Sequence, residues 1–191
     1  MKQHKRLPLA LLLVFALCIQ TLSFTSAAAA LADPEPVFSA SDMTFSSGTD
    51  AVALPQSAVT QLSGLSSGTI IVDFTPTAMS TANCLFSLSN SSVTDAYFNL
   101  YIDNRGFLGL EVRNHGETRY VNLQGPAEVT RNTRHIMALS ADPQEGYKFY
   151  FDGDMVFQMP VALYELWEYD YRFMSTVNSA DVGYMGATYR N

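Results

Sequence analysis

The chain has 191 residues and a formal net charge of -7, from 11 basic and 18 acidic residues. This acidic balance argues against a nucleic-acid partner, because binding phosphates requires a basic face. A hydrophobic content of 48% with only 15% charged residues excludes an intrinsically disordered chain. The length allows one domain with a leader, and not two large domains.

The N-terminus has the three parts of a secretory signal peptide. Met1–Arg6 is basic, Leu7–Leu22 is almost wholly apolar, and Ser23–Ala32 is rich in small residues. This order predicts cleavage near Ala32 and a secreted mature domain of residues 33–191, with no membrane span after cleavage. A retained membrane anchor is the alternative, but the apolar run is short for a span and no stop-transfer pattern follows it.

Cleavage at this position also determines which cysteines remain in the mature domain. It removes Cys18 and leaves Cys84 as the single cysteine, so no intrachain disulfide is expected in the mature domain. Cys84 lies in an apolar run and has no local partner that would lower the pKa of its thiol. We therefore interpret it as a buried strand cysteine and not as a nucleophile.

The mature chain has the pattern of a β protein. Residues 33–67, rich in Ser, Ala, Pro and Thr, predict an irregular segment with one or two short strands. Gly and Asx turns then separate short runs rich in β-branched and aromatic residues, which indicates an all-β sandwich. The predicted strands are 69–75, 84–89, 97–103, 107–113, 118–123, 135–141, 147–151 and 155–159. In the aromatic residues 160–178 we expect a short helix or a long packed loop, with Trp167 partly buried.

The strands 97–103 and 107–113 form a predicted hairpin with one apolar and one polar face. Apolar residues alternate with polar or aromatic ones along both strands, so the two apolar sets can face the core together. Tyr101, Glu111 and Arg113 then share the other face. An aromatic ring, a carboxylate and a guanidinium on one sheet face suit a sugar. The simpler alternative is a solvated face with a cross-strand ion pair.

No pattern in the sequence predicts a catalytic centre, a metal site or a cofactor site. His115 and His135 lie in different segments, which argues against a zinc site. Neither a phosphate-binding Gly loop nor a G-x-S-x-G elbow is present. The acids of Glu165–Asp170 have the wrong spacing for a glycosidase pair on one strand face, so we interpret them as an exposed edge. Asp152–Asp154 could contribute to a calcium site, but a hairpin turn is the simpler account.

Several short motifs follow one another along residues 37–190. The most specific are an E-x-R strand at Glu111–Arg113 and a late G-x-T-x-R at Gly186–Arg190. The others are L-S-S-G-T-I-I-V-D-F from Leu65, C-L-F-S-L-S-N from Cys84, Y-F-N-L-Y-I from Tyr97, H-I-M-A-L from His135 and Y-F-D-G from Tyr150. Together they resemble the N-terminal lectin-like domain of bacterial sialidases, which is the family 40 carbohydrate-binding module.

This resemblance implies a concanavalin A-like jelly-roll sandwich, similar to laminin-G-like domains, that binds terminal sialic acid. It implies that Arg113 and Arg190 engage the sugar carboxylate, which suits a planar and permanently charged guanidinium. It also implies that Glu111 accepts hydrogen bonds from a hydroxyl or the acetamido N–H, and that Tyr101 packs against the acetamido or glycerol side. Ala82 lies near the position of a branched apolar wall residue in the family and is at best a small substitute.

The parent enzymes of this family carry a separate six-bladed propeller, for which this chain is too short. The resemblance therefore implies the sialic-acid-binding module of a secreted bacterial exo-alpha-sialidase, with no catalytic residues of its own. The family continues past the position of Arg190 with a site-lining tyrosine and closing strands, so we expect an incomplete C-terminus. The alternatives are a laminin-G-like module that binds another glycan or a protein, and a glycosidase in its own right.

Overall fold

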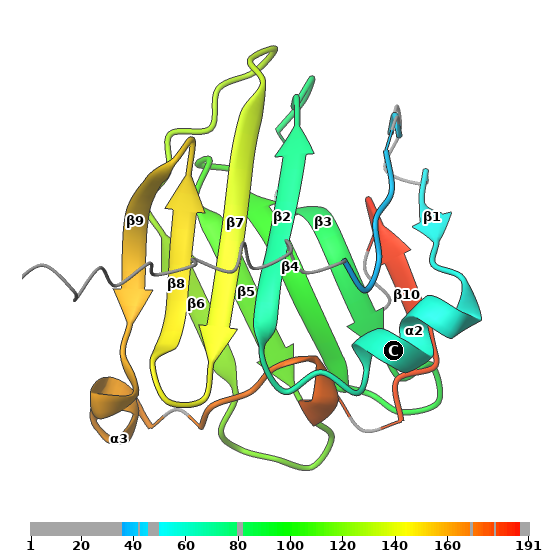
Figure 1. Ribbon diagram of the computed structural model, residues 1–191, viewed down its shortest axis with the longest axis vertical. Coiled ribbons are helices and arrows are strands. Elements are labelled where there is room, and N and C mark those ends of the chain that lie inside the picture. Colours follow the sequence, from blue (N-terminus) through cyan, green and yellow to red (C-terminus); the bar gives the residue numbers. More distant parts are fainter. Residues whose placement is uncertain are drawn as a thin grey trace, which may run out of the picture. The chain divides into compact units, whose positions relative to one another are not determined.

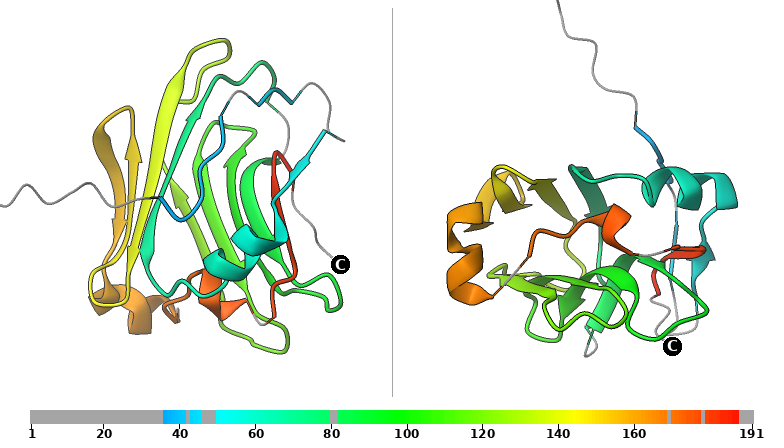
Figure 2. Two further views of the ribbon diagram at one scale, coloured as in Figure 1. Left: turned by 45° about the vertical axis from the view of Figure 1, so that its right-hand side comes forward. Right: turned by 90° about the horizontal axis from the view of Figure 1, so that it is seen from below.

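The computed structural model describes residues 36–41, 43–45, 50–79, 82–168, 170–177 and 179–187, and of Ala82 and Trp167 it describes the backbone only. These residues form two antiparallel β-sheets that pack face to face as a sandwich (Figure 1). Short helices lie at one end of the two layers (Figure 2). The all-β jelly-roll sandwich expected from the sequence is thereby confirmed.

The larger sheet has six strands in the order β1-β10-β3-β4-β5-β6, and the smaller has four in the order β2-β7-β8-β9. The larger sheet consists of β1 (Val52–Ala53), β3 (Ala82–Ser89), β4 (Tyr97–Asp103), β5 (Leu108–Arg113), β6 (Val121–Gly125) and β10 (Val182–Met185). The smaller sheet consists of β2 (Gly68–Phe74), β7 (His135–Asp142), β8 (Gly146–Phe151) and β9 (Asp154–Met159). Each of the eight predicted strands coincides with an observed strand to within three residues at either end.

The helix α2 (Gln56–Leu62) was not predicted from the sequence. Its composition of small and polar residues gives only a weak helical pattern, and the sandwich supplies the missing stabilisation. Ala58, Val59 and Leu62 are buried against the core. Because these residues are one and three positions apart, their side chains form a single apolar stripe along the helix. No helix within the described part of the chain is long and apolar enough to cross a membrane.

The aromatic segment after β9 contains short helices, which is one of the two alternatives expected from the sequence. It comprises η1 (Val161–Leu163), α3 (Tyr164–Trp167) and, further along, η2 (Met174–Thr176). The chain between α3 and β10 runs across the end of the sandwich (Figure 2). Tyr164 and Phe173 are buried, which agrees with the expected packing of this segment. The side chain of Trp167 is outside the described residues, so its partial burial stays a prediction.

The core lies between the two layers and is built from the apolar faces of both sheets. At its centre, Phe98, Leu100 and Leu110 of the larger sheet meet Met137 and Leu139 of the smaller sheet, and all five are 0% exposed. Burial of a side chain of this size stabilises the fold by roughly 1.5–3 kcal/mol. The apolar alternation that predicted the hairpin therefore marks the inner face correctly.

The strand β10 is joined to the rest of the larger sheet by a side-chain clamp at its start. The Asp181 carboxylate accepts hydrogen bonds from the Ser91 backbone N–H at 2.7 Å and from the Ser91 hydroxyl at 2.6 Å. The hydrogen bond from the Ser91 hydroxyl holds the pKa of Asp181 below its usual value of 3.8. This clamp fixes where the last strand enters the sheet.

Truncation of a central core residue should destabilise the protein far more than truncation of the same residue type at the surface. Leu110→Ala removes a side chain that is 0% exposed, whereas Leu166→Ala removes one that is 74% exposed. We expect Leu110→Ala to lower the free energy of unfolding by about 3–5 kcal/mol and Leu166→Ala by less than about 0.5 kcal/mol. Urea denaturation of both variants measures the difference, and equal losses would contradict the packing described.

The Asp181 clamp predicts a pH-dependent contribution to stability. Because the pKa of Asp181 is lowered in the folded state, its stabilisation is complete above the unfolded pKa and is lost as the pH falls through the folded pKa. The loss of unfolding free energy caused by Asp181→Asn should therefore be larger at pH 7 than at pH 3. Urea denaturation at the two pH values tests this, with Ser91→Ala as the variant that removes the partner hydroxyl. A loss that is independent of pH would contradict the clamp.

Candidate functional site

The register of β4 with β5 determines which side chains share the outer face of the larger sheet. Directly opposite residues of an antiparallel pair project to the same side. Three cross-strand pairs occupy this face: Tyr97 with Arg113, Asn99 with Glu111, and Tyr101 with Gly109. The prediction that Tyr101, Glu111 and Arg113 lie on one face is therefore confirmed.

Most of the side chains on this face are buried, and Arg113 is the one of this set that reaches solvent, so the face is not simply solvated. Asn99 is 1% exposed, Tyr97 is 3% exposed, and Glu111 and Tyr101 are 8% and 9% exposed. Strand alternation predicts the side of the sheet on which a residue lies, but it does not predict what covers that side. Buried polar groups are tolerated only when they are hydrogen-bonded, so the contacts among these residues are decisive.

Glu111 is the centre of these contacts. Its Oε1 accepts a hydrogen bond from the Tyr97 hydroxyl at 2.7 Å and another from Arg113 Nε at 2.9 Å. Both donors come from the adjacent cross-strand pair. The carboxylate therefore fixes the guanidinium of Arg113 on the sheet face.

Arg113 is held from a second side by an aromatic ring. Its guanidinium carbon lies 4.0 Å from the centroid of the Tyr120 ring, a distance at which a cation is attracted to the ring face. Burial opposes the charge, but the neighbouring Tyr97 and Glu111 outweigh this effect and raise the pKa of Arg113. With 31% of its side chain exposed, Arg113 presents a permanent, oriented positive charge to solvent.

Tyr101 lies flat across Gly109 on the same face. A Cβ atom at Gly109 would be only 2.2 Å from Cζ of the Tyr101 ring, so glycine is required for this position of the ring. On its far side, Gln124 Nε2 lies 3.4 Å from the Tyr101 hydroxyl, and the Gln124 Oε1 accepts a hydrogen bond from Arg105 at 2.7 Å. The aromatic surface of Tyr101 is thus supported from below and from one edge.

Ala187, the last described residue of the chain, lies on this face of the larger sheet. The carbonyl oxygen of Ala187 accepts a hydrogen bond from the Ser87 hydroxyl at 2.7 Å, and it lies 2.9 Å from Cys84 Sγ. Cys84 Sγ is also 3.1 Å from Asn99 Oδ1. Cys84 therefore lies on a strand, as expected, but it is only half-buried and faces outward beside Tyr101.

Two predicted site residues remain untested by this geometry. Arg190 and the side chain of Ala82 lie outside the described residues, although the backbone of Ala82 is opposite Asp103 in the sheet. Two residues that support the site, Tyr97 and Tyr120, have no role predicted from the sequence. The alternation that places Tyr101 on the face places Tyr97 there too, whereas Tyr120 precedes β6 and no local pattern connects it with Arg113.

The hairpin between β8 and β9 has a structural explanation. Asp152 adopts a left-handed conformation with φ of 50°, and its carboxylate accepts a hydrogen bond from the Ile136 N–H at 2.8 Å. Its other oxygen lies 2.8 Å from His135 Nδ1. These contacts agree with the interpretation of this segment as a turn. Among the described residues, no group of three or more His, Cys, Asp or Glu side chains could hold a metal ion.

Comparison with known proteins agrees with this architecture. The family model for the sialidase N-terminal domain matches residues 44–191. The CBM40 module of the Ruminococcus gnavus IT-sialidase, solved with α2,3-sialyllactose, has a TM-score of 0.70 and 26% identity, and the match covers 81% of each chain. The same module with α2,6-sialyllactose has a TM-score of 0.59 and 27% identity, covering 70% of this chain and 71% of that one.

A longer enzyme shares the fold of this chain. The NanB sialidase of Streptococcus pneumoniae has a TM-score of 0.61 and 22% identity, and the match covers 72% of this chain but 21% of that enzyme. No curated protein matches the chain. The resemblance to the lectin-like domain of sialidases, first seen in the sequence motifs, is confirmed.

The close approach of Tyr101 to Gly109 predicts a coupled pair of substitutions. Gly109→Ala should displace the Tyr101 ring and lower the free energy of unfolding by about 1–3 kcal/mol, because the added methyl group overlaps the ring. In a Tyr101→Ala background the same substitution should cost much less. Urea denaturation of the four proteins in this double-mutant cycle measures the coupling, and equal costs in both backgrounds would contradict the contact.

Proposed function

Because this chain belongs to the family of sialidase N-terminal domains, we propose that it is a carbohydrate-binding module that holds a terminal sialic acid on the outer face of its larger sheet. The observation that carries this proposal is the fixed guanidinium of Arg113, which lies beside Glu111 and on the same face as Tyr101. The Ruminococcus gnavus module solved with sialyllactose supports the choice of ligand.

The chemistry of Arg113 suits the carboxylate of sialic acid. Its Nε is bonded to Glu111, whereas its Nη1 lies 3.7 Å from Asp95, which is too long for a strong hydrogen bond. The guanidinium therefore retains donors for a carboxylate, which it can bind in a planar, two-point geometry. Because two contacts orient the group before any ligand arrives, little side-chain entropy remains to be lost on binding.

Glu111 and Tyr101 supply the complementary contacts in this proposal. Glu111 would accept a hydrogen bond from a hydroxyl or the acetamido N–H of the sugar, and the Tyr101 ring would pack against the acetamido or glycerol side. The chain as a whole is acidic, with a formal net charge of -7, so attraction by the overall field cannot explain recognition of an anion. Recognition must come from local contacts with the arginine.

Arg190 is proposed as the second arginine for the carboxylate. Ala187 is anchored on β3 by Ser87 and Cys84, and Arg190 follows it by three residues. Three extended residues span at most about 10 Å, so the anchored carbonyl supports a position of Arg190 near this face. With only a methyl side chain, Ala82 would contact less of the sugar on the opposite side of the site than a branched residue would.

The predicted signal peptide supports a role outside the cell. We propose that residues 1–32 are removed, and that the secreted domain brings an exo-alpha-sialidase to sialylated glycans. The length of the NanB sialidase, of which the matching part is 21%, supports a link between such a domain and a catalytic one. In this proposal the residues of the present chain bind the sugar, and a separate propeller domain hydrolyses it.

Substitution of Arg113 is the direct test of the proposed function. Arg113→Ala should weaken binding of 3′-sialyllactose by about ten- to a hundred-fold, because hydrogen bonds to a charged group are lost. Arg113→Lys should give an intermediate loss, since lysine keeps the positive charge but lacks the planar, two-point N–H geometry of a guanidinium. Isothermal titration calorimetry measures both, with the exposed Arg131→Ala as the matched control.

Two results would contradict this proposal. One is a folded protein that does not bind 3′-sialyllactose, and the other is an Arg113→Ala variant that binds it as well as the unmodified protein. Lactose, which lacks the sialic acid, should leave the backbone amide signals of Glu111 and Arg113 unchanged in NMR spectra.

A further inference from the structure

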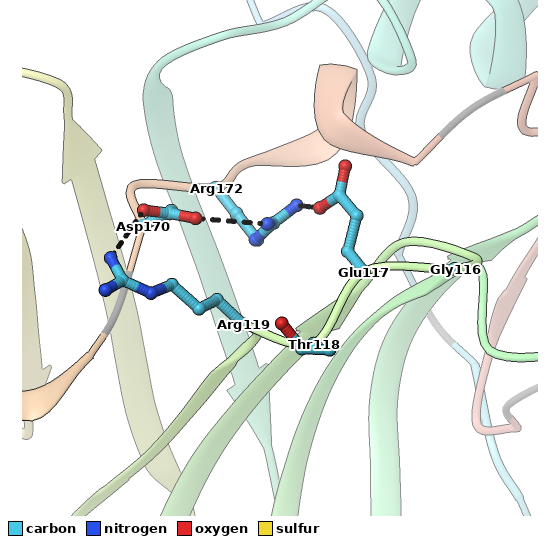
Figure 3. Close-up of a pocket in the computed structure, with 6 residues that line it drawn as sticks. All are labelled: Gly116, Glu117, Thr118, Arg119, Asp170 and Arg172. Atoms are coloured by element: carbon cyan, nitrogen blue, oxygen red, sulfur yellow. Dashed lines mark hydrogen bonds and ion pairs between the residues drawn. The ribbon is translucent and has the colours of Figure 1, made fainter.

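A separate pocket lies between the loop that joins β5 to β6 and the segment that follows α3 (Figure 3). We refer to it as the loop pocket. Its volume of about 360 Å³ is near the lower end of ligand sites, which span roughly 300–1,000 Å³. It is lined by Gly116, Glu117, Thr118, Arg119, Asp170 and Arg172. None of these residues belongs to the face formed by Tyr101, Glu111 and Arg113.

The pocket contains an arginine that is buried without a full set of partners. Arg172 is 6% exposed. Its Nη1 forms an ion pair with Glu117, and its Nη2 lies 3.5 Å from Asp170 Oδ2. Its Nε has no hydrogen-bond partner among the described residues. Because this Nε is itself buried and a guanidinium carries five N–H donors, the capacity of Arg172 to bind a further acceptor lies in its Nη2, whose contact with Asp170 is long.

Asp170 lies between the two arginines of the pocket and contacts both of them weakly (Figure 3). Its Oδ1 is 3.5 Å from Arg119 Nη1, and its Oδ2 is 3.5 Å from Arg172 Nη2. Charge-assisted hydrogen bonds are usually 2.7–2.9 Å long, so these long contacts leave the arginines able to bind other acceptors. By contrast, the Glu117 carboxylate already has two partners, because besides its ion pair with Arg172 it accepts a hydrogen bond from Asn114 Nδ2 at 3.0 Å.

The lining of the loop pocket selects the chemical class of its ligand. The described residues that line the pocket include two arginines and two acids, whose charges balance, so they do not favour an ion of either sign. No aromatic or aliphatic side chain is among these described lining residues. Donors from Arg119 and Arg172 stand beside the Asp170 acceptor and the Thr118 hydroxyl. Sugar hydroxyl groups both donate and accept hydrogen bonds and match this mixture.

We propose that the loop pocket is a second glycan-binding site, which takes a neutral sugar ring. This site requires neither Arg113 nor a sialic acid, so it goes beyond the proposed function. A glycan surface that presents both kinds of sugar would then engage the module at two places. Two weak sites on one module raise the overall affinity for such a surface without any new contact.

The test is an NMR titration of the isotopically labelled protein carrying Arg113→Ala, with lactose as the probe. This background disables the proposed sialic-acid site. We expect saturable shifts of the backbone amides of Gly116, Thr118 and Arg119, with a dissociation constant in the millimolar range. Adding Arg119→Ala, whose side chain is 43% exposed, should weaken this binding by at least about tenfold. Adding Arg131→Ala to the same background, as the matched control, should leave it unchanged.

The outcomes separate this proposal from the previous one. Absence of saturable shifts in the folded protein, or shifts that persist with Arg119→Ala, would overturn the second site. Binding of glucuronate without lactose, weakened by salt, would mark an anion site and would also overturn it. If lactose shifts these amides but the unmodified protein fails to bind 3′-sialyllactose at Glu111 and Arg113, the sialic-acid function fails and the second site stands.

Discussion

The antiparallel register between β4 and β5 is the constraint on which both the core and the candidate site depend. It pairs Phe98 with Val112 and Leu100 with Leu110 on the inner face. The same register pairs Tyr97 with Arg113 on the outer face. Because side chains alternate with a period of two, a slip of one residue would turn the apolar set to the outer face and the polar set into the core. Core packing thus fixes the geometry of the outer face.

On the outer face, buried polar side chains are hydrogen-bonded to one another. Glu111 receives hydrogen bonds from both Tyr97 and Arg113, and Ala187 is anchored over β3 by Ser87. Such a network is costly if any member loses its partner. The network also makes the site rigid, because the Arg113 guanidinium is oriented before a ligand arrives. In the proposed function, this preformed arrangement compensates for the acidity of the rest of the domain.

The sequence was informative wherever a local period determines the structure. Alternation predicted the strands and assigned Tyr101, Glu111 and Arg113 to one face, and the E-x-R and G-x-T-x-R motifs indicated the family. It failed where segments distant in sequence meet. Neither the burial of the outer face, the ring of Tyr120 beside Arg113, nor the loop pocket around Arg172 has a local signal, because each depends on the tertiary packing of two or more segments. The helix α2 was missed because packing against the core, and not its own propensity, stabilises it.

The most direct measurement is a crystal structure of the protein with 3′-sialyllactose bound. The account predicts that the sialic-acid carboxylate lies within hydrogen-bond distance of the Arg113 guanidinium, with the sugar ring over the face shared by Glu111 and Tyr101. A sialic acid that is bound elsewhere, with Arg113 keeping its contacts to Glu111 and Tyr120 and making none to the ligand, would contradict it.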